Sequence, residues 1–163
     1  RQATGPHLLT VSSTCGSTAL AHDPISEKRS ATPWHPVTVR DAAEARAVTE
    51  IAARLDVAVL LVTEPDASGR YGPAYLLEMM RQAGLGDGCV HALIDCGDSA
   101  GQAMLALRLG WKDVHMTGPP DTTRRIAEMA ESVGARFHQN RPACLQGPVD
   151  QSLEDQLRNA AAN

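Results

Sequence analysis

The sequence predicts an open α/β fold, with a mainly parallel sheet of about five strands and helices on both faces. Strand-like and helix-like segments alternate along the chain with short connections, as in a series of βα repeats. The run VAVLLV at 57–62 is continuously apolar, which is typical of a parallel strand buried on both faces. A chain of 163 residues is also shorter than the ~200 residues of a closed eight-unit barrel, so the sheet is expected to be open.

The first half of the pattern begins with a short strand at 37–39. Asp41 follows as the expected N-cap of a helix, and Glu44 lies three residues further on, as in a capping box. Apolar residues at helical spacing form the inner face of that helix: Val48, Ile51, Ala52 and Leu55. The strand at 57–62 comes next, and Pro73 then opens a second helix at a position where its missing N–H costs little.

The second half repeats the alternation, and glycines mark where its helices end. The expected elements are a strand at 90–94, a helix at about 99–109 stopped by Gly110, a strand at 113–117, a helix ending near Gly134, a strand at 135–138 and a short last helix with Leu153 and Leu157.

Residues 1–36 have no sustained hydrophobic period and are rich in Ser, Thr, Pro and His. We therefore expect an irregular N-terminal arm, 1–36, in front of a single α/β domain, 37–163. The arm still contains Leu8, Leu9, Val11 and Trp34, which a groove on another protein or on a second subunit could accept. The sequence thus predicts contact with a protein partner, or homo-oligomer formation, through the arm.

Composition excludes several classes of function. The net charge is −4 and aromatic residues make up 3% of the chain, so neither a basic surface nor a stacking platform for nucleic acid is expected. No apolar run approaches the ~20 residues that cross a bilayer, so we expect no membrane contact. The four cysteines lack C-x-x-C spacing, which predicts reduced thiols in a cytoplasmic protein and no metal site recognisable from spacing. Neither a P-loop nor a G-x-G-x-x-G motif is present, so no cofactor is assigned.

Polar residues gather in three loops, 64–72, 95–101 and 117–121, each of which follows a predicted strand. In open α/β sheets, ligands bind beyond the carboxyl ends of the strands, where these loops should meet. The candidate ligand-binding residues are Glu64, Asp66, Arg70, Asp95, Asp98, Ser99 and Thr117.

The stretch Asp95-Cys96-Gly97-Asp98 has two interpretations. As a catalytic loop, it would place the Cys96 thiol at a helix N-terminus, with His115 on the next strand as its base. As a structural turn, it would use Gly97 for the backbone reversal and Asp98 or Ser99 as the helix cap. The adjacent acids favour the turn, because negative charge raises the pKa of a thiol. The catalytic candidates are therefore Asp95, Cys96 and His115.

Two functions from different classes remain. The absence of any recognised catalytic spacing favours a small non-catalytic α/β module that binds a small molecule or a protein, in a regulatory or accessory role, with its site at the carboxyl edge of the sheet. The alternative is a small enzyme, with or without a metal ion, that uses the acids at the strand ends together with Cys96 and His115.

Overall fold

A computed structural model describes residues 34–86, 88–146 and 149–162. The chain divides into two units, Arg1–Ala31 and Thr32–Asn163, and all the described residues belong to the second. The predicted docking of the arm falls on residues that lie almost entirely outside the described part of the chain. Trp34 is the one proposed anchor that is described, and it packs against the sheet of its own domain.

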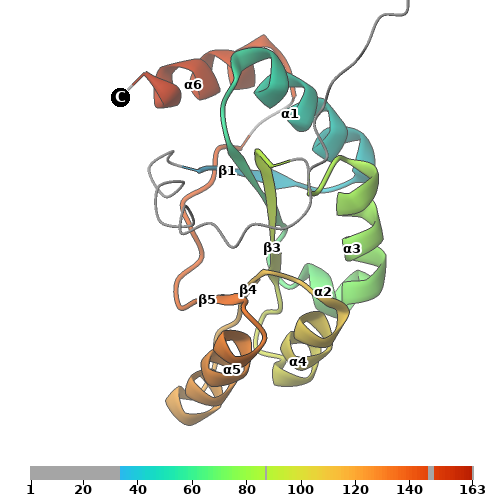
Figure 1. The fold of residues 1–163 in the computed structure, drawn as a ribbon, viewed down its shortest axis with the longest axis vertical. Helices are drawn as coiled ribbons and strands as arrows, with labels where there is room; N and C mark the ends of the chain where they lie inside the picture. The colour runs from blue at the N-terminus through green and yellow to red at the C-terminus, as the bar shows by residue number, and fades with distance from the viewer. Residues whose placement is uncertain (1–33, 87, 147–148, 163) are drawn as a thin grey trace, which may run out of the picture. The chain divides into compact units, whose positions relative to one another are not determined.

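The described domain contains one sheet of five parallel strands, as predicted (Figure 1). The strands are β1 (His35–Val39), β2 (Val59–Thr63), β3 (Val90–Asp95), β4 (Asp113–His115) and β5 (Arg136–His138). They lie side by side in the order in which they occur in the sequence, so β1 and β5 are the two edge strands. All five residues of β2 are buried, which agrees with the continuous apolar run from which this strand was predicted.

Six helices occur in the described part of the chain, and most match the predicted ones. They are α1 (Ala42–Leu55), α2 (Ala67–Tyr71), α3 (Pro73–Gln82), α4 (Ala100–Leu109), α5 (Pro120–Ser132) and α6 (Gln151–Ala161). Asp41 is the N-cap of α1 and accepts the N–H of Glu44 at 2.8 Å, as the capping pattern indicated. The short helix α2 lies within 64–72, a segment that the sequence analysis treated as a loop. None of these helices is both long and apolar enough to cross a membrane.

The helices lie on one face of the sheet, whereas the sequence analysis placed them on both. Buried residues of α1, α3, α4, α5 and α6 all belong to one apolar cluster, together with the strand residues Val37, Leu61, Ile94 and Val114. The strand order explains this arrangement. Each right-handed crossover that moves to the next strand in the same direction places its helix on the same face.

The other face of the sheet is covered in part by the chain that follows β5. We call residues 139–146 the strap. The strap leaves the β5 edge of the sheet and reaches the opposite edge, where Leu145 forms a parallel bridge with Val37 on β1 (Figure 1). The Leu145 N–H donates to the Pro36 carbonyl at 2.8 Å, and the Thr38 N–H donates to the Leu145 carbonyl at 3.1 Å.

A small apolar cluster lies under the strap. It contains Leu60, Val62 and Leu93 from the central strands, with Trp34 and Cys144 packed against them. The rest of this helix-free face carries polar side chains, among them Asp113, Arg136 and His138.

Candidate functional site

The Asp95 carboxylate joins three segments at the carboxyl edge of the sheet. Its Oδ1 accepts the backbone N–H groups of Asp66 at 3.1 Å and Gly97 at 2.9 Å. Its Oδ2 accepts Arg141 Nη1 of the strap at 2.6 Å, and Arg141 Nη2 also donates to the Thr63 carbonyl at 2.7 Å. Asp95 is 4% exposed, and these three donors supply the hydrogen bonds that a buried carboxylate requires. A ligand would have to displace one of them to reach it.

The rest of the Asp95-Cys96-Gly97-Asp98 stretch has the geometry of a strand-to-helix turn. Gly97 has φ +55°, a left-handed conformation that side-chain-bearing residues rarely adopt. Ser99 is the N-cap of α4 and accepts the N–H of Gln102 at 3.3 Å, while Asp98 is exposed. From the sequence, either Asp98 or Ser99 could be the N-cap of this helix. In the structure the N-cap of α4 is Ser99.

The Cys96 side chain is fully buried, and burial raises the pKa of its thiol to about 12. The nearby Ser68 hydroxyl lowers this pKa, but Asp95 and Asp66 raise it. The helix N-terminus therefore does not produce a reactive thiolate at this position.

The predicted ligand-binding residues of the first loop contact each other. Arg70 Nη2 lies 3.1 Å from Glu64 Oε2, and its guanidinium lies 5.5 Å from the centre of the Tyr71 ring. The Asp66 carboxylate lies close to Gly69 and Gly97, and a Cβ added to either glycine would come within 2.7 Å of Asp66 Oδ1. These contacts pack the first loop against the second.

His115 lies on β4 between Asp95 of β3 and His138 of β5 in the strand register. Its Nδ1 is 2.8 Å from the His138 carbonyl oxygen. A carbonyl oxygen can only accept, so Nδ1 carries a proton and donates it to this hydrogen bond. The side chain is 5% exposed, which fits a hydrogen-bonded residue of the sheet.

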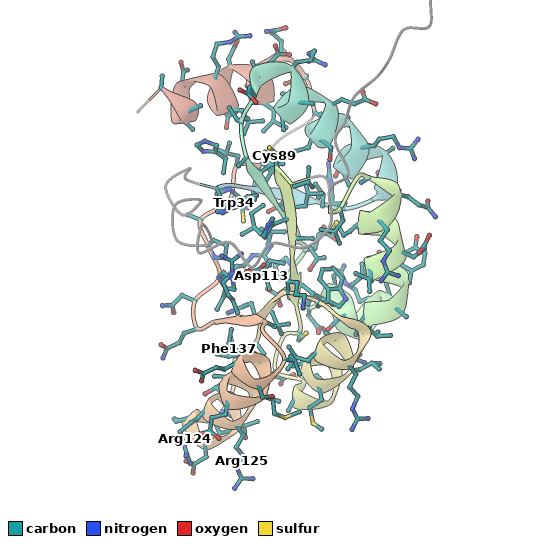
Figure 2. The ribbon with its side chains drawn as sticks, viewed as in Figure 1. Trp34, Cys89, Asp113, Arg124, Arg125 and Phe137 are labelled. Carbon is teal, nitrogen blue, oxygen red and sulfur yellow. The ribbon has the colours of Figure 1, made fainter. Side chains whose placement is uncertain are left out.

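A second polar cluster, which was not predicted from the sequence, surrounds Asp113 on the helix-free face. Arg136 donates from Nε to Asp113 Oδ1 at 2.8 Å and from Nη2 to Oδ2 at 3.1 Å. His138 Nε2 lies 2.7 Å from Oδ1, and His91 Nδ1 lies 3.7 Å from Oδ2. Asp113, labelled in Figure 2, is the first residue of β4, next to the edge strand β5.

The Asp113 side chain has 0% relative exposure. Burial by itself would raise the pKa of the Asp113 carboxyl, but hydrogen bonds from His138 and Arg136 outweigh burial and hold the pKa below its ordinary value. The signal in the sequence was alternation, since polar residues stand at every second position of β4 and β5: Asp113, His115, Arg136 and His138.

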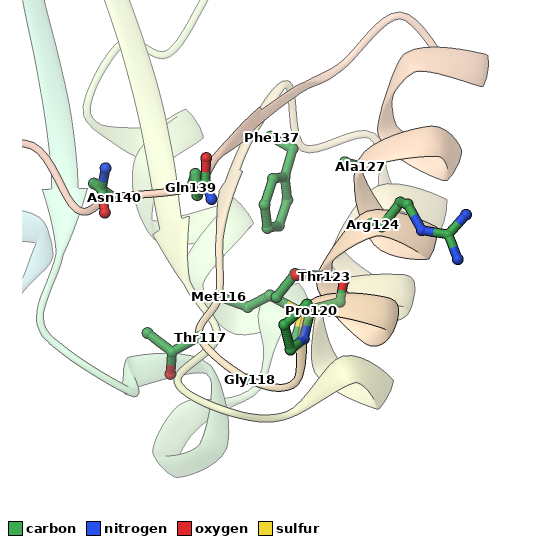
Figure 3. Close-up of a pocket in the computed structure, with 10 residues that line it drawn as sticks. All are labelled: Met116, Thr117, Gly118, Pro120, Thr123, Arg124, Ala127, Phe137, Gln139 and Asn140. Atoms are coloured by element: carbon green, nitrogen blue, oxygen red, sulfur yellow. Dashed lines mark hydrogen bonds between the residues drawn. The ribbon is translucent and has the colours of Figure 1, made fainter.

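A cleft of about 590 Å³ opens beyond the carboxyl ends of β4 and β5, against α5 (Figure 3). Thr117 is the one predicted ligand-binding residue in its lining. The lining consists of Met116, Thr117, Gly118, Pro120, Thr123, Arg124, Ala127, Phe137, Gln139 and Asn140. Gln139 and Asn140 are the first residues of the strap, so the strap contributes to the cleft. Through Arg141 the strap also contributes to the set of hydrogen bonds around the Asp95 carboxylate, which we call the Asp95 junction.

The described residues show no group of three or more His, Cys, Asp and Glu side chains arranged to hold a metal ion. Glu64, Asp98 and the Asp113 cluster lie outside the lining of the cleft. The catalytic candidates Asp95, Cys96 and His115 are also absent from it.

No model of a protein family matches this sequence, and no curated protein matches it. A function for this chain is therefore inferred from the geometry and chemistry of its described residues.

The Asp95 junction predicts that Asp95→Asn lowers the free energy of unfolding by about 2–3 kcal/mol, because Arg141 loses its partner while it stays mostly buried. Denaturant unfolding measures this loss. Adding Arg141→Leu to Asp95→Asn should cost less than the sum of the two single variants. The exposed neighbour provides a matched control, and Asp98→Asn should change stability by no more than about 0.5 kcal/mol. If Asp95→Asn and Asp98→Asn lowered the free energy of unfolding equally, the stabilising role of the Asp95 junction would be contradicted.

The Asp113 cluster predicts a loss of stability in acid. The pKa of Asp113 is lower in the folded chain than its ordinary value of 3.8, so the ionised carboxylate stabilises the fold above about pH 4. This contribution disappears as the pH falls through the folded-state pKa. Unfolding measured from about pH 5 to about pH 2 should show a shallower decline for Asp113→Asn, by up to ~1.4 kcal/mol per pH unit. Asp155→Asn, on the surface of α6, should keep the wild-type slope.

The buried thiol predicts slow alkylation of Cys96. With a pKa of about 12, about 1 part in 10⁵ of the thiol is ionised at neutral pH, before burial restricts access further. Iodoacetamide labelling followed by peptide mass spectrometry should show the exposed Cys89 reacting far sooner than Cys96. Labelling of both thiols at the same rate in the folded chain would show that Cys96 is activated.

Proposed function

We propose that this chain is a non-catalytic module that binds a small molecule in the cleft beyond β4 and β5. The cleft lies at the carboxyl edge of a parallel sheet, where open α/β proteins bind their ligands. Its volume of about 590 Å³ is in the range of small-molecule sites. Of the three loops in which the sequence predicts a site, the proposal keeps only the loop at 117–121, to which Phe137, Gln139 and Asn140 are added.

One observation favours binding over catalysis. The ten lining residues include no Asp, Glu, His or Cys side chain. General acid–base and thiol catalysis depend on these groups, which the domain holds elsewhere in hydrogen-bonded positions. The cleft instead offers amides, hydroxyls and apolar surface, which suit recognition. This supports a regulatory or accessory role.

We further propose that the protein is soluble and located in the cytoplasm. The described cysteines, Cys89, Cys96 and Cys144, are free thiols, which supports a reducing compartment.

The second candidate function is that of an enzyme, and the Asp113–His138 pair is the observation that favours it. A carboxylate that accepts from one imidazole nitrogen orients the ring and leaves the other nitrogen as a proton acceptor. Such a pair would act on a substrate held against the helix-free face rather than in the cleft. His138→Gln should then abolish turnover of that substrate and leave ligand binding in the cleft intact.

The test of the proposed function is a thermal-shift and NMR screen of small metabolites, repeated on two alanine-to-tryptophan variants. Ala127 lines the cleft on α5, so Ala127→Trp should fill it and abolish binding. Ala74 is exposed on α3 and is absent from the lining, so Ala74→Trp should bind normally. A compound present at 100 times its Kd should stabilise the wild-type chain by about 2.7 kcal/mol.

Equal binding by the two tryptophan variants would place the site elsewhere. A screen in which no compound binds the wild-type chain would overturn the proposed function.

A further inference from the structure

The cleft has a flat apolar wall. Phe137 is the single phenylalanine of the chain, and its half-buried ring points into the space between the strands and α5 (Figure 3). Met116, which is 1% exposed, is also part of the lining, and the Pro120 ring adds apolar surface from the first turn of α5. A planar group could stack on Phe137, because aromatic faces are attracted at van der Waals separation.

Two amide side chains also line the cleft, and Figure 3 shows Gln139 nearer to Phe137 and Asn140 further along the strap. Gln139 and Asn140 line the cleft, both are exposed, and neither side chain makes a hydrogen bond within the described part of the chain. Each amide carries a donor and an acceptor in one plane. The Thr117 hydroxyl donates to the Gly97 carbonyl at 3.2 Å, so it faces a ligand only as an acceptor. Together these groups suit a ligand whose edge alternates donors and acceptors.

The cleft is poorly suited to an anion. Arg124 lies 3.3 Å from Asp121 and 3.5 Å from Glu128, and its side chain extends away from Phe137 (Figures 2 and 3). Pro119 and Pro120 have no N–H, which removes two donors from the start of α5. The N–H groups of Thr122 and Thr123 both donate to the Pro119 carbonyl at 3.0 Å, and the remaining N–H of this turn belongs to Asp121, whose own carboxylate would repel an anion. A phosphate would find few partners here.

We propose that the ligand is a neutral planar heterocycle of the nucleobase class, stacked on Phe137, with its edge hydrogen-bonded to the amides of Gln139 and Asn140. This inference rests on the proposed function and names the ligand class of the same cleft. Side-chain amides pair with base edges in this way, and one ring accommodates one base rather than a strand.

The experiment titrates the full chain with adenosine, cytidine, guanosine and uridine, and with ribose and adenosine monophosphate for comparison. Saturation-transfer NMR reports contact with the base protons, and calorimetry gives the affinity. At least one nucleoside should bind, ribose should not, and the monophosphate should bind no more tightly than adenosine.

Two variants of the aromatic wall test the stacking. Phe137→Leu should weaken binding by about tenfold, because stacking contributes ~1–3 kcal/mol per base. Phe137→Tyr keeps an aromatic face and should retain most of the affinity. Circular dichroism confirms that each variant is folded. Arg125→Gln, at an exposed position of α5 outside the lining of the cleft, is the control for charge and should leave nucleoside affinity unchanged.

Three results would overturn the inference: failure of all four nucleosides to bind, equal affinity of Phe137→Leu and the wild-type chain, or much tighter binding of the monophosphate. If the nucleosides fail but another metabolite binds the wild-type chain and Ala127→Trp blocks it, the ligand class is wrong and the proposed function stands. If no compound binds at all, both proposals are wrong.

Discussion

The rest of the carboxyl edge depends on one buried ion pair, between Asp95 and Arg141. Through it, a single carboxylate holds the loop after β2, the turn after β3 and the strap. Removing either partner would leave a mostly buried charge unpaired, so the two side chains stabilise the fold only together. The pair also anchors the residue that follows Gln139 and Asn140, and so determines where these two amides sit in the cleft.

The singly wound sheet explains why the polar residues lie where they do. All the described helices lie on one face, so within the described residues the other face has no helical layer and the strap covers only part of it. That face can therefore carry Asp113, Arg136 and His138 on adjacent strands, provided that they satisfy one another. In a sheet covered by helices on both faces, such side chains would replace apolar packing.

The cleft beyond β4 and β5 has no Asp, Glu, His or Cys side chain in its lining. Asp95 and Asp113 are engaged in hydrogen bonds and ion pairs, and Cys96 is buried. The cleft combines an aromatic ring with free amides, which is a surface suited to recognition. The chemistry of this lining is the physical reason for our proposal that the chain is a binding module.

The sequence by itself determined the features that depend on near neighbours along the chain. The buried strand β2, the Asp41 cap and the turn at Gly97 all follow from local hydrogen bonding, burial and backbone preference. Only the tertiary structure decided which distant residues meet. Arg141 binds Asp95 across 46 positions, and Asp113 is separated from Arg136 and His138 by 23 and 25. Spacing in the sequence carries no information on such pairs, because strand order and the path of the strap bring them together. The choice of one face for all the helices was decided in the same way, since it follows from strand order rather than from the pattern of any single helix.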